Sequence, residues 1–193
     1  RIVGGRTLTE QRVAISAQAD GTFDAIIHTG TVAKTEHNAL PEPFILATLN
    51  AYAAKGFKLD VEVATLDMVA NTFMRAPGEA VGTFALECAV DELAGRLGMD
   101  PIELRIRNEP DKDPIKGTPF SSRNIVEAYR TGAERFGWAR RNTKPGQTRE
   151  GRWLTGMGVA AAFRNNLVMK SGARVRLDSR GAVTVETDMT DIG

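Results

Sequence analysis

Residues 74–80 and the helical pattern after them constrain this chain more than any other feature. Pro77 fixes its own φ angle and Gly78 allows a sharp bend. The helix that follows therefore starts with main-chain N–H groups that have no partner inside the helix. A helix start of this kind is suited to binding an anion. The pattern alone also allows an ordinary strand-to-helix turn, because Pro and Gly are common in such turns.

Two consecutive helices are predicted after this bend. The first has a buried stripe at three- and four-residue spacing, made of Leu86, Val90, Leu93 and Leu97. Glu87 lies outside that stripe, so we expect it to be an ordinary surface or packing charge. Gly98 is predicted to end the helix in a left-handed conformation. Asp100 and Pro101 then occupy the N-cap and first helical position of a second helix.

The rest of the chain predicts further strands and helices around these two. The alternation in residues 11–19 and 25–29 around Asp20-Gly21 predicts a β-hairpin. Other segments are predicted to be helices at 44–54 and 121–136, and strands at 58–65, 156–163, 173–177 and 182–189. The helix at 121–136 is predicted to be capped by Ser121-Ser122, to end at Gly137 and to bury Ile125, Val126, Tyr129, Ala133 and Phe136. Residues 140–150 read as a polar loop. The predicted fold class is mixed α+β, with antiparallel strands flanking a central group of helices.

Composition excludes two classes of partner. The chain has 25 Lys and Arg against 24 Asp and Glu, a net charge of +1, so no basic field indicates nucleic acid. No apolar run approaches the about 18 residues that a membrane span needs.

The cysteine and histidines offer little chemistry by themselves. The single Cys88 can form neither an internal disulfide nor an iron–sulfur cluster with four thiolates, and we expect it to be a small buried hydrophobic residue in the first helix. His28 lies in a predicted strand and His37 in a loop, with no third ligand at a suitable spacing. The sequence therefore predicts no metal site made of protein side chains.

A series of motifs in one register resembles a known family. The motifs are Arg75-Ala76-Pro77-Gly78-Glu79, Phe84-Ala85, Asp91-Glu92-Leu93-Ala94, Gly98-Met99-Asp100-Pro101 and Glu103-Leu104-Arg105. They resemble the molybdenum-cofactor-binding large subunit of the xanthine dehydrogenase and aldehyde oxidoreductase family, the molybdenum hydroxylases. The similarity points to the bacterial aldehyde oxidoreductase branch. Their order and length make the match far more specific than a lone glycine motif.

The resemblance implies a domain organisation and a cofactor. It implies that the chain is a piece of a longer subunit, in which residues 1–110 are part of the first molybdopterin-binding domain. Residues 111–193, which start with a charged loop containing two prolines, would be a linker helix and the start of the second domain. The implied cofactor is molybdenum–molybdopterin in the cytosine dinucleotide form. Iron–sulfur clusters and FAD would lie on partner subunits, and the cellular compartment stays unknown.

The resemblance also assigns cofactor-binding residues. It places Met74, Arg75 and Ala76 against the molybdenum centre, where main-chain dipoles at Arg75 stabilise its negatively charged ligands. A second cofactor loop would start at the end of the chain, at Thr190, Asp191, Ile192 and Gly193, although an ordinary strand end is the alternative. The family's general-base glutamate is expected beyond Gly193. Glu79 is explained by its place at a helix start. The isolated 193 residues are therefore expected to be inactive.

Three positions bear on the substrate. Pro77 falls where purine-oxidising relatives carry an aromatic residue that stacks on the substrate, and the arginine that such relatives have near Phe44 is absent. The resemblance places Phe163, with Arg164 beside it, near a second substrate-contacting aromatic, but a core phenylalanine is an equal alternative. These departures favour an aldehyde substrate. A hydroxylase of purines or other N-heterocycles, and a non-catalytic interaction module, remain as alternatives.

Overall fold

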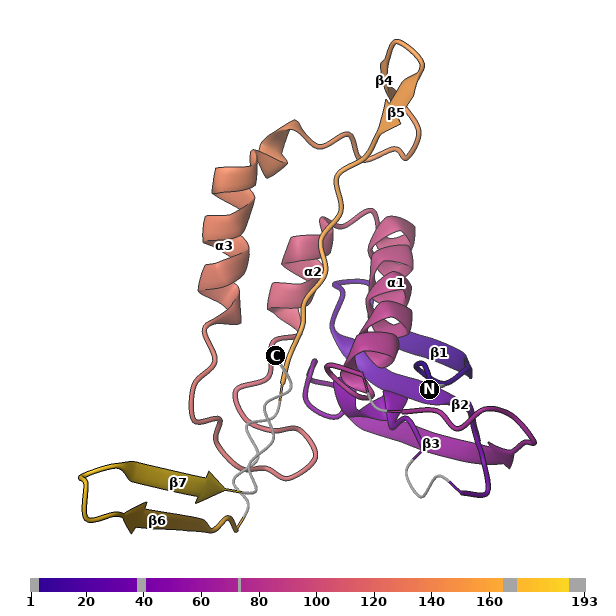
Figure 1. The fold of residues 1–193 in the computed structure, drawn as a ribbon. Coiled ribbons are helices and arrows are strands. Elements are labelled where there is room, and N and C mark those ends of the chain that lie inside the picture. Colours follow the sequence, from indigo (N-terminus) through magenta and orange to yellow (C-terminus); the bar gives the residue numbers. More distant parts are fainter. Residues whose placement is uncertain (1–3, 38–40, 73, 165–169, 188–193) are drawn as a thin grey trace. The chain divides into compact units, whose positions relative to one another are not determined.

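The structure is a computed structural model that describes residues 4–37, 41–72, 74–164 and 170–187 (Figure 1). The chain forms two compact units, divided between Phe163 and Arg164. The predicted second cofactor loop, residues 190–193, lies outside the described residues. No helix in the described part of the chain has the length and apolar character to cross a membrane.

The first unit contains a sheet with the strand order β1-β2-β3. Its strands are β1 (Thr9–Ala17), β2 (Phe23–Lys34) and β3 (Gly56–Thr65). β1 and β2 pair antiparallel with Ile15 opposite Ile26, and the connecting turn contains Gly21 with a φ of 89°. The predicted hairpin is therefore confirmed. β3 pairs parallel to β2, with Leu59 opposite His28, a direction that the alternation of residues 58–65 leaves open.

The predicted helix at residues 44–54 is wrong. Only a single turn of 3-10 helix, η1 (Phe44–Ala47), forms there. The main-chain groups that a longer helix would use are bonded elsewhere. Arg123 donates to the carbonyl oxygens of Asn50 and Ala51 at 2.9 Å, and the N–H of Ala53 donates to the carbonyl of Asn108 at 2.8 Å. Contacts from distant residues thus replace the local helix.

Two helices follow the bend, as predicted. α1 (Glu79–Leu97) packs on β1 and η1, and Gly98 ends it with a φ of 64°. α2 (Pro101–Arg107) begins at Asp100, whose side chain accepts from the N–H groups of Ile102 and Glu103. The core between these helices and the sheet is built from Phe23, Ile26, Ala51, Tyr52, Leu86, Val90, Ala94 and Leu104.

Glu87 on α1 is the centre of a buried polar network, contrary to its expected place as an ordinary charge. Its side chain is 5% exposed. One carboxylate oxygen accepts from Arg105 Nε at 2.9 Å and from the N–H of Ala161 at 2.8 Å, and the other accepts from the hydroxyl of Tyr52. Arg105 also pairs with Asp91 at 2.8 Å. Burial, with the charge of Glu87 as a second cause, raises the pKa of Tyr52 well above its usual value.

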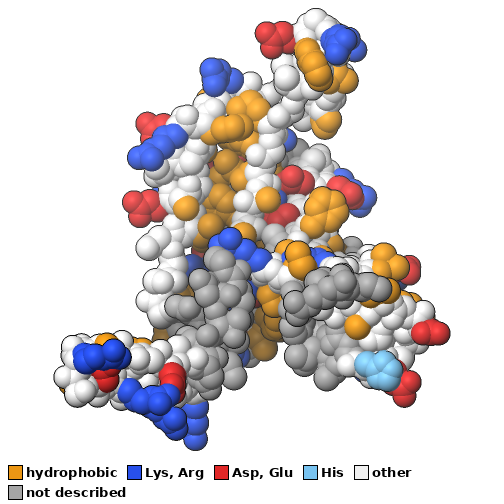
Figure 2. Space-filling model, viewed as in Figure 1, with side chains coloured by type: hydrophobic (Ala, Val, Ile, Leu, Met, Phe, Trp, Pro, Cys, Tyr) orange, Lys and Arg blue, Asp and Glu red, His pale blue; other side chains and the backbone are white. Residues whose placement is uncertain are grey.

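The N-cap of α3 (Ile125–Phe136) is Asn124, so the helix begins later than the predicted Ser121-Ser122 cap. It ends as predicted at Gly137. Its predicted buried stripe is confirmed except at Phe136, since Ile125, Val126 and Ala133 are half-buried. Tyr129 is buried, but Phe136 is 57% exposed. A second, smaller apolar cluster joins Tyr129 to Ile102 of α2 and to Ala161. Figure 2 shows hydrophobic side chains gathered along this side of α3.

The segment after α3 differs from the sequence prediction. After η2 (Trp138–Arg140), a short antiparallel hairpin of β4 (Thr148–Glu150) and β5 (Trp153–Thr155) replaces part of the predicted loop. Residues 156–163, predicted as a strand, pair with no strand in the described part of the chain. The bond from the N–H of Ala161 to Glu87 fixes this segment instead.

The second unit is a hairpin of β6 (Ala173–Leu177) and β7 (Val183–Thr187), with Val175 opposite Val185. Asp178 closes the turn by accepting from the N–H groups of Arg180 and Ala182. The predicted strand at 173–177 is therefore confirmed. The strand predicted at 182–189 is confirmed over Val183–Thr187, and residues 188 and 189 lie outside the described residues. Together with the first unit, this confirms the mixed α+β fold class.

The helix contact at Gly82 yields a test of the packing. A Cβ atom at Gly82 would lie 1.8 Å from the carbonyl oxygen of Phe44, whereas one at the exposed Gly95 of the same helix would meet nothing within 4 Å. We expect Gly82→Ala to destabilise the chain by at least about 2 kcal/mol because of overpacking. Gly95→Ala should stabilise it by about 0.5–1 kcal/mol through helix propensity. Urea unfolding followed by circular dichroism measures both, and equal effects would contradict the close approach of α1 to η1.

The network at Glu87 yields a second test. We expect Glu87→Gln to destabilise the chain by about 3–5 kcal/mol, because it leaves the buried guanidinium of Arg105 without its main counter-charge. Glu92→Gln on the exposed face of α1 is the matched control and should change stability by less than about 0.5 kcal/mol. Thermal and urea unfolding of both variants give the comparison. If Glu87→Gln lowers the free energy of unfolding no more than Glu92→Gln does, the role of Glu87 as a structural centre is refuted.

Candidate cofactor-binding bend

The bend at residues 74–78 lies at the surface, immediately before α1. Met74 and Arg75 are exposed, Ala76 and Pro77 are half-buried, and Gly78 is buried. Ala76 has a φ of 58° and Gly78 a φ of 83°, so both adopt a positive φ that residues with a Cβ atom rarely take. The bend is thus strained at Ala76 and open to a ligand on its exposed side.

Arg6, which lies before β1, donates hydrogen bonds to the main chain of this bend. Its Nη2 donates to the carbonyl oxygen of Arg75 at 2.6 Å, and its Nη1 donates to that of Ala76 at 3.3 Å. The same Nη1 pairs with Oε1 of Glu42 at 2.6 Å. The planar guanidinium group can therefore span two neighbouring carbonyls and a carboxylate at once.

Glu42 completes the arrangement. Its side chain is fully buried, and Oε1 also accepts from the main-chain N–H of Gly78 at 2.7 Å. A buried carboxylate needs such partners because its desolvation is costly. We call Arg6 and Glu42 the Arg6–Glu42 clamp. The sequence analysis did not identify it, since these residues lie 36 positions apart and carry no motif.

Gly78 is also required by packing. A Cβ atom at this position would lie 2.3 Å from the carbonyl oxygen of Pro43. The bend therefore rests directly on residues 42–44, and its glycine allows this close approach.

His28 and Gln11 form a further link between the sheet and α1. Nε2 of Gln11 donates to the hydroxyl of Thr9 and, at 3.4 Å, to the carbonyl of Val81, so its Oε1 is the atom that accepts from His28 Nε2 at 2.9 Å. Nδ1 of His28 then accepts from the hydroxyl of Thr48 at 2.6 Å. His28 is thus a neutral imidazole, and burial lowers its pKa to about 4. In the described part of the chain, no cluster of three His, Cys, Asp or Glu residues could hold a metal ion.

Of the predicted substrate residues, Pro77 belongs to the bend, whereas Phe163 has other surroundings. Phe163 is half-buried, packs against both apolar clusters, and has the Arg123 guanidinium 4.3 Å above its ring. This packing agrees with the core alternative that the sequence left open. Arg164 is exposed and begins the second unit, while Pro77 stands in the bend itself.

Cys88 is exposed, contrary to the expectation that it would be buried. It lies one helical turn after Phe84, which is 75% exposed, so this face of α1 points outward. Glu79 occupies the first turn of α1, as the helix-dipole explanation requires.

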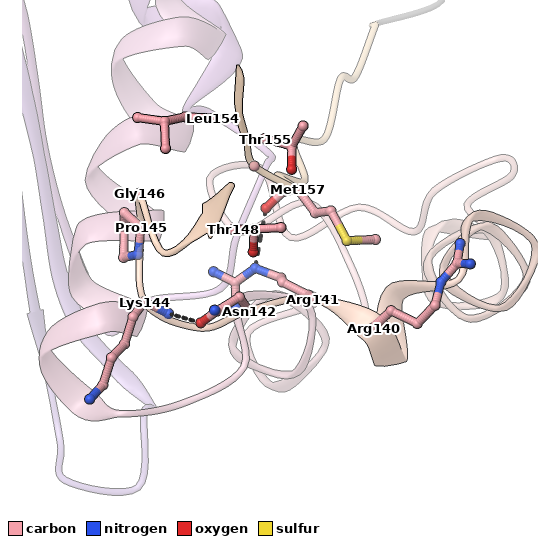
Figure 3. A pocket seen from close by; sticks show the side chains of 11 residues that line it. Arg140, Arg141, Asn142, Lys144, Pro145, Gly146, Thr148, Leu154, Thr155 and Met157 are labelled. Carbon is pink, nitrogen blue, oxygen red and sulfur yellow. Dashed lines mark hydrogen bonds between the residues drawn. The ribbon is translucent and has the colours of Figure 1, made fainter. Parts of the chain in front are cut away.

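Two hollows lie away from the bend. One of about 280 Å³ is lined by residues from η2, the following loop and β5. Figure 3 shows Arg141 turned into this hollow. Its Nε donates to the carbonyl of Met157 at 3.2 Å. An apolar hollow of about 300 Å³ lies between α3 and residues 158–162. No predicted site residue lines either hollow.

Known proteins share both the sequence and the fold. The molybdopterin cofactor-binding domain family matches residues 1–109. The aldehyde oxidoreductase molybdenum-binding subunit PaoC of Escherichia coli (strain K12) is 49% identical over 189 residues, which cover 97% of this chain and 26% of PaoC. The xanthine dehydrogenase molybdenum-binding subunit of Escherichia coli O157:H7 is 33% identical over 128 residues, covering 62% of this chain and 17% of that subunit.

A solved structure of CO dehydrogenase from Oligotropha carboxidovorans shares the fold with a TM-score of 0.68 at 16% identity, over 96% of this chain and 27% of that one. This likeness shows a shared fold. The chain belongs to the molybdopterin cofactor-binding domain family. This confirms the resemblance seen at residues 75–108. The chain spans about a quarter of the length of PaoC, 26%.

Burial of neutral His28 predicts a pH dependence of stability. The unfolded chain binds a proton at His28 near pH 6.5, and the folded chain does so only near pH 4. Between these values the unfolded state holds more protons, so stability falls as the pH falls, by up to about 3 kcal/mol. In the variant His28→Gln, the free energy of unfolding should not show this decrease toward low pH. Urea unfolding of both proteins across this pH range measures it, and parallel pH curves would contradict the prediction.

Proposed function

We propose that this chain supplies a cofactor-contacting bend to the molybdenum-binding subunit of a hydroxylase that oxidises aldehydes to carboxylic acids. The observation that carries the proposal is the bend itself, whose carbonyls are bonded to Arg6 on the inner side. On the exposed side of the bend, main-chain N–H groups can donate to a ligand. The 49% identity to a subunit named for aldehyde oxidoreduction supports the substrate class.

The residues present fit a molybdenum–pterin group. In this proposal, the chain contacts the cofactor through the main chain of Met74, Arg75 and Ala76, of which Met74 and Arg75 are exposed. Fixed N–H dipoles stabilise negative ligands without reorganising. When bound, the cofactor supplies the two-electron redox chemistry, and the chain supplies placement and electrostatics. Thr190, Asp191, Ile192 and Gly193 would begin a second cofactor loop.

The substrate would approach the side of the bend at Pro77. A proline cannot stack on a flat purine as an aromatic ring can, so the site favours aldehydes. We include Phe163 and Arg164 as substrate-contacting residues of the complete subunit. In this assignment Arg123, which lies over the Phe163 ring and pairs with Glu109, would fix the aromatic side chain.

The wider organisation is also part of this proposal. Residues 1–110 would belong to the first molybdopterin-binding domain, and residues 111–193 would form a linker helix and start the second. The cofactor would be the cytosine dinucleotide form, electrons would leave through iron–sulfur and FAD subunits, and a glutamate elsewhere in the longer protein would act as the general base.

A hydroxylase of purines or other N-heterocycles is the second candidate. The 33% identity to a xanthine dehydrogenase subunit favours it. The absence of an aromatic residue at Pro77 opposes it. A non-catalytic interaction module with the same fold is the third reading.

The full-length protein that contains this chain tests these readings. Purified from a host that makes the cofactor, it should contain stoichiometric molybdenum and pterin, and it should oxidise benzaldehyde faster than xanthine. The 193-residue chain alone should be inactive, since a site shared among several loops loses its preorganised contacts when some are missing. Activity on xanthine alone would overturn the aldehyde assignment. A protein free of molybdenum and pterin would support the interaction module.

A further inference from the structure

The orientation of one peptide group in the bend is fixed by the structure. The carbonyl oxygen of Arg75 lies 2.6 Å from Nη2 of Arg6. In a planar trans peptide, the C=O of one residue and the N–H of the next point in opposite directions. The N–H of Ala76 therefore points away from Arg6, toward the outer side of the bend.

The next two residues and the carbonyl of Ala76 offer no free group. Pro77 has no N–H, and the N–H of Gly78 donates to the buried Glu42. The carbonyl of Ala76 accepts from Arg6 and from the N–H of Ala80. Within the described ranges, the N–H of Ala76 donates no hydrogen bond. Ala76 thus carries a donor that this part of the bend can offer to a ligand.

This arrangement requires support from outside the bend. Ala76 has a φ of 58°, a left-handed conformation that is unfavourable for a residue with a Cβ atom. Arg6 bonds to the carbonyls of the peptides on both sides of Ala76, and Glu42 bonds to the N–H two residues later. Hydrogen bonds on each side of Ala76 therefore maintain its strained conformation.

The clamp is itself rigid because it is buried. Glu42 is fully buried, and the side chain of Arg6 is 24% exposed. A charge-assisted pair in this setting has few alternative geometries. Lysine could not replace Arg6, because an ammonium group lacks the planar fork that reaches two carbonyls and a carboxylate together.

We infer that Arg6 and Glu42 are positioning residues that preset the main-chain N–H of Ala76 as a donor to an anionic ligand of the cofactor. Neither residue faces the ligand. Both act through the peptide between Arg75 and Ala76. The identity of the ligand rests on the proposed function, but the presetting of the donor does not.

Amide hydrogen exchange tests the clamp without the cofactor. The full-length protein would be prepared from a host that cannot make the pterin, as wild type and as Arg6→Ala, Glu42→Gln and Arg12→Ala. Arg12 is an exposed arginine on β1 and serves as the matched control. In Arg6→Ala and Glu42→Gln, the N–H groups of Gly78 and Ala80 should exchange about 10- to 100-fold faster, since charged hydrogen bonds are lost. Unchanged exchange in both variants would overturn the proposal.

Cofactor loading gives a readout that a purely structural role would not move. In a host that makes the pterin, Arg6→Ala should lower the molybdenum content of the folded protein by about 10-fold or more, as for other residues that orient ligands. Arg6→Lys should be impaired nearly as much, Arg12→Ala should load normally, and added methylguanidinium should restore part of the loading to Arg6→Ala. The melting temperature identifies protein that has simply unfolded, and Glu42→Gln then provides the second variant.

The outcomes separate this inference from the proposed function. Normal loading in both Arg6→Ala and Glu42→Gln would overturn the positioning role. A wild-type protein without molybdenum would instead overturn the proposed function, and the exchange experiment would still decide whether the clamp presets the bend.

Discussion

The buried ion pair between Glu87 and Arg105 is the interaction on which the rest of the first unit depends. It joins α1 to α2 at 2.8 Å, and the same carboxylate bonds to Tyr52 and to the N–H of Ala161. The carboxylate of Glu87 therefore links α1 to α2, to Tyr52 and to the segment that contains Ala161. Since desolvated charges tolerate few geometries, the pair fixes the direction of α1 and hence the place where its first turn begins.

A second buried glutamate, Glu42, repeats this arrangement at the start of α1. Glu42 bonds to Arg6 and to the N–H of Gly78, as Glu87 bonds to Arg105 and to the N–H of Ala161. In each case the carboxylate needs polar partners, and a main-chain N–H from a remote segment is one of them. Glu42 fixes the bend at residues 74–78, and Glu87 fixes the segment that ends at Phe163. The fold thus uses buried charge to place loops that have no regular structure.

The elements that sequence predicted well are those encoded by neighbouring residues. Asp20-Gly21, Gly98, Gly137 and Asp100 mark turns and helix ends, and each does so through its own backbone or side-chain geometry. The predictions at residues 44–54, Cys88 and Phe136 failed because they depend on what packs against them. Arg123 interrupts the predicted helix from 72 residues away, a contact that no local pattern contains.

For this protein, the sequence by itself determined the first hairpin, the two helices after the bend, the position of the bend and the family, because these follow from φ preferences, capping groups and motifs in one register. Only the tertiary structure decided what the bend can do. The orientation of the peptide at Arg75 and the strain at Ala76 depend on Arg6, which lies 69 residues earlier. Hydrogen bonds over such separations form only when the chain is folded, so their partners are set by the packing of whole elements.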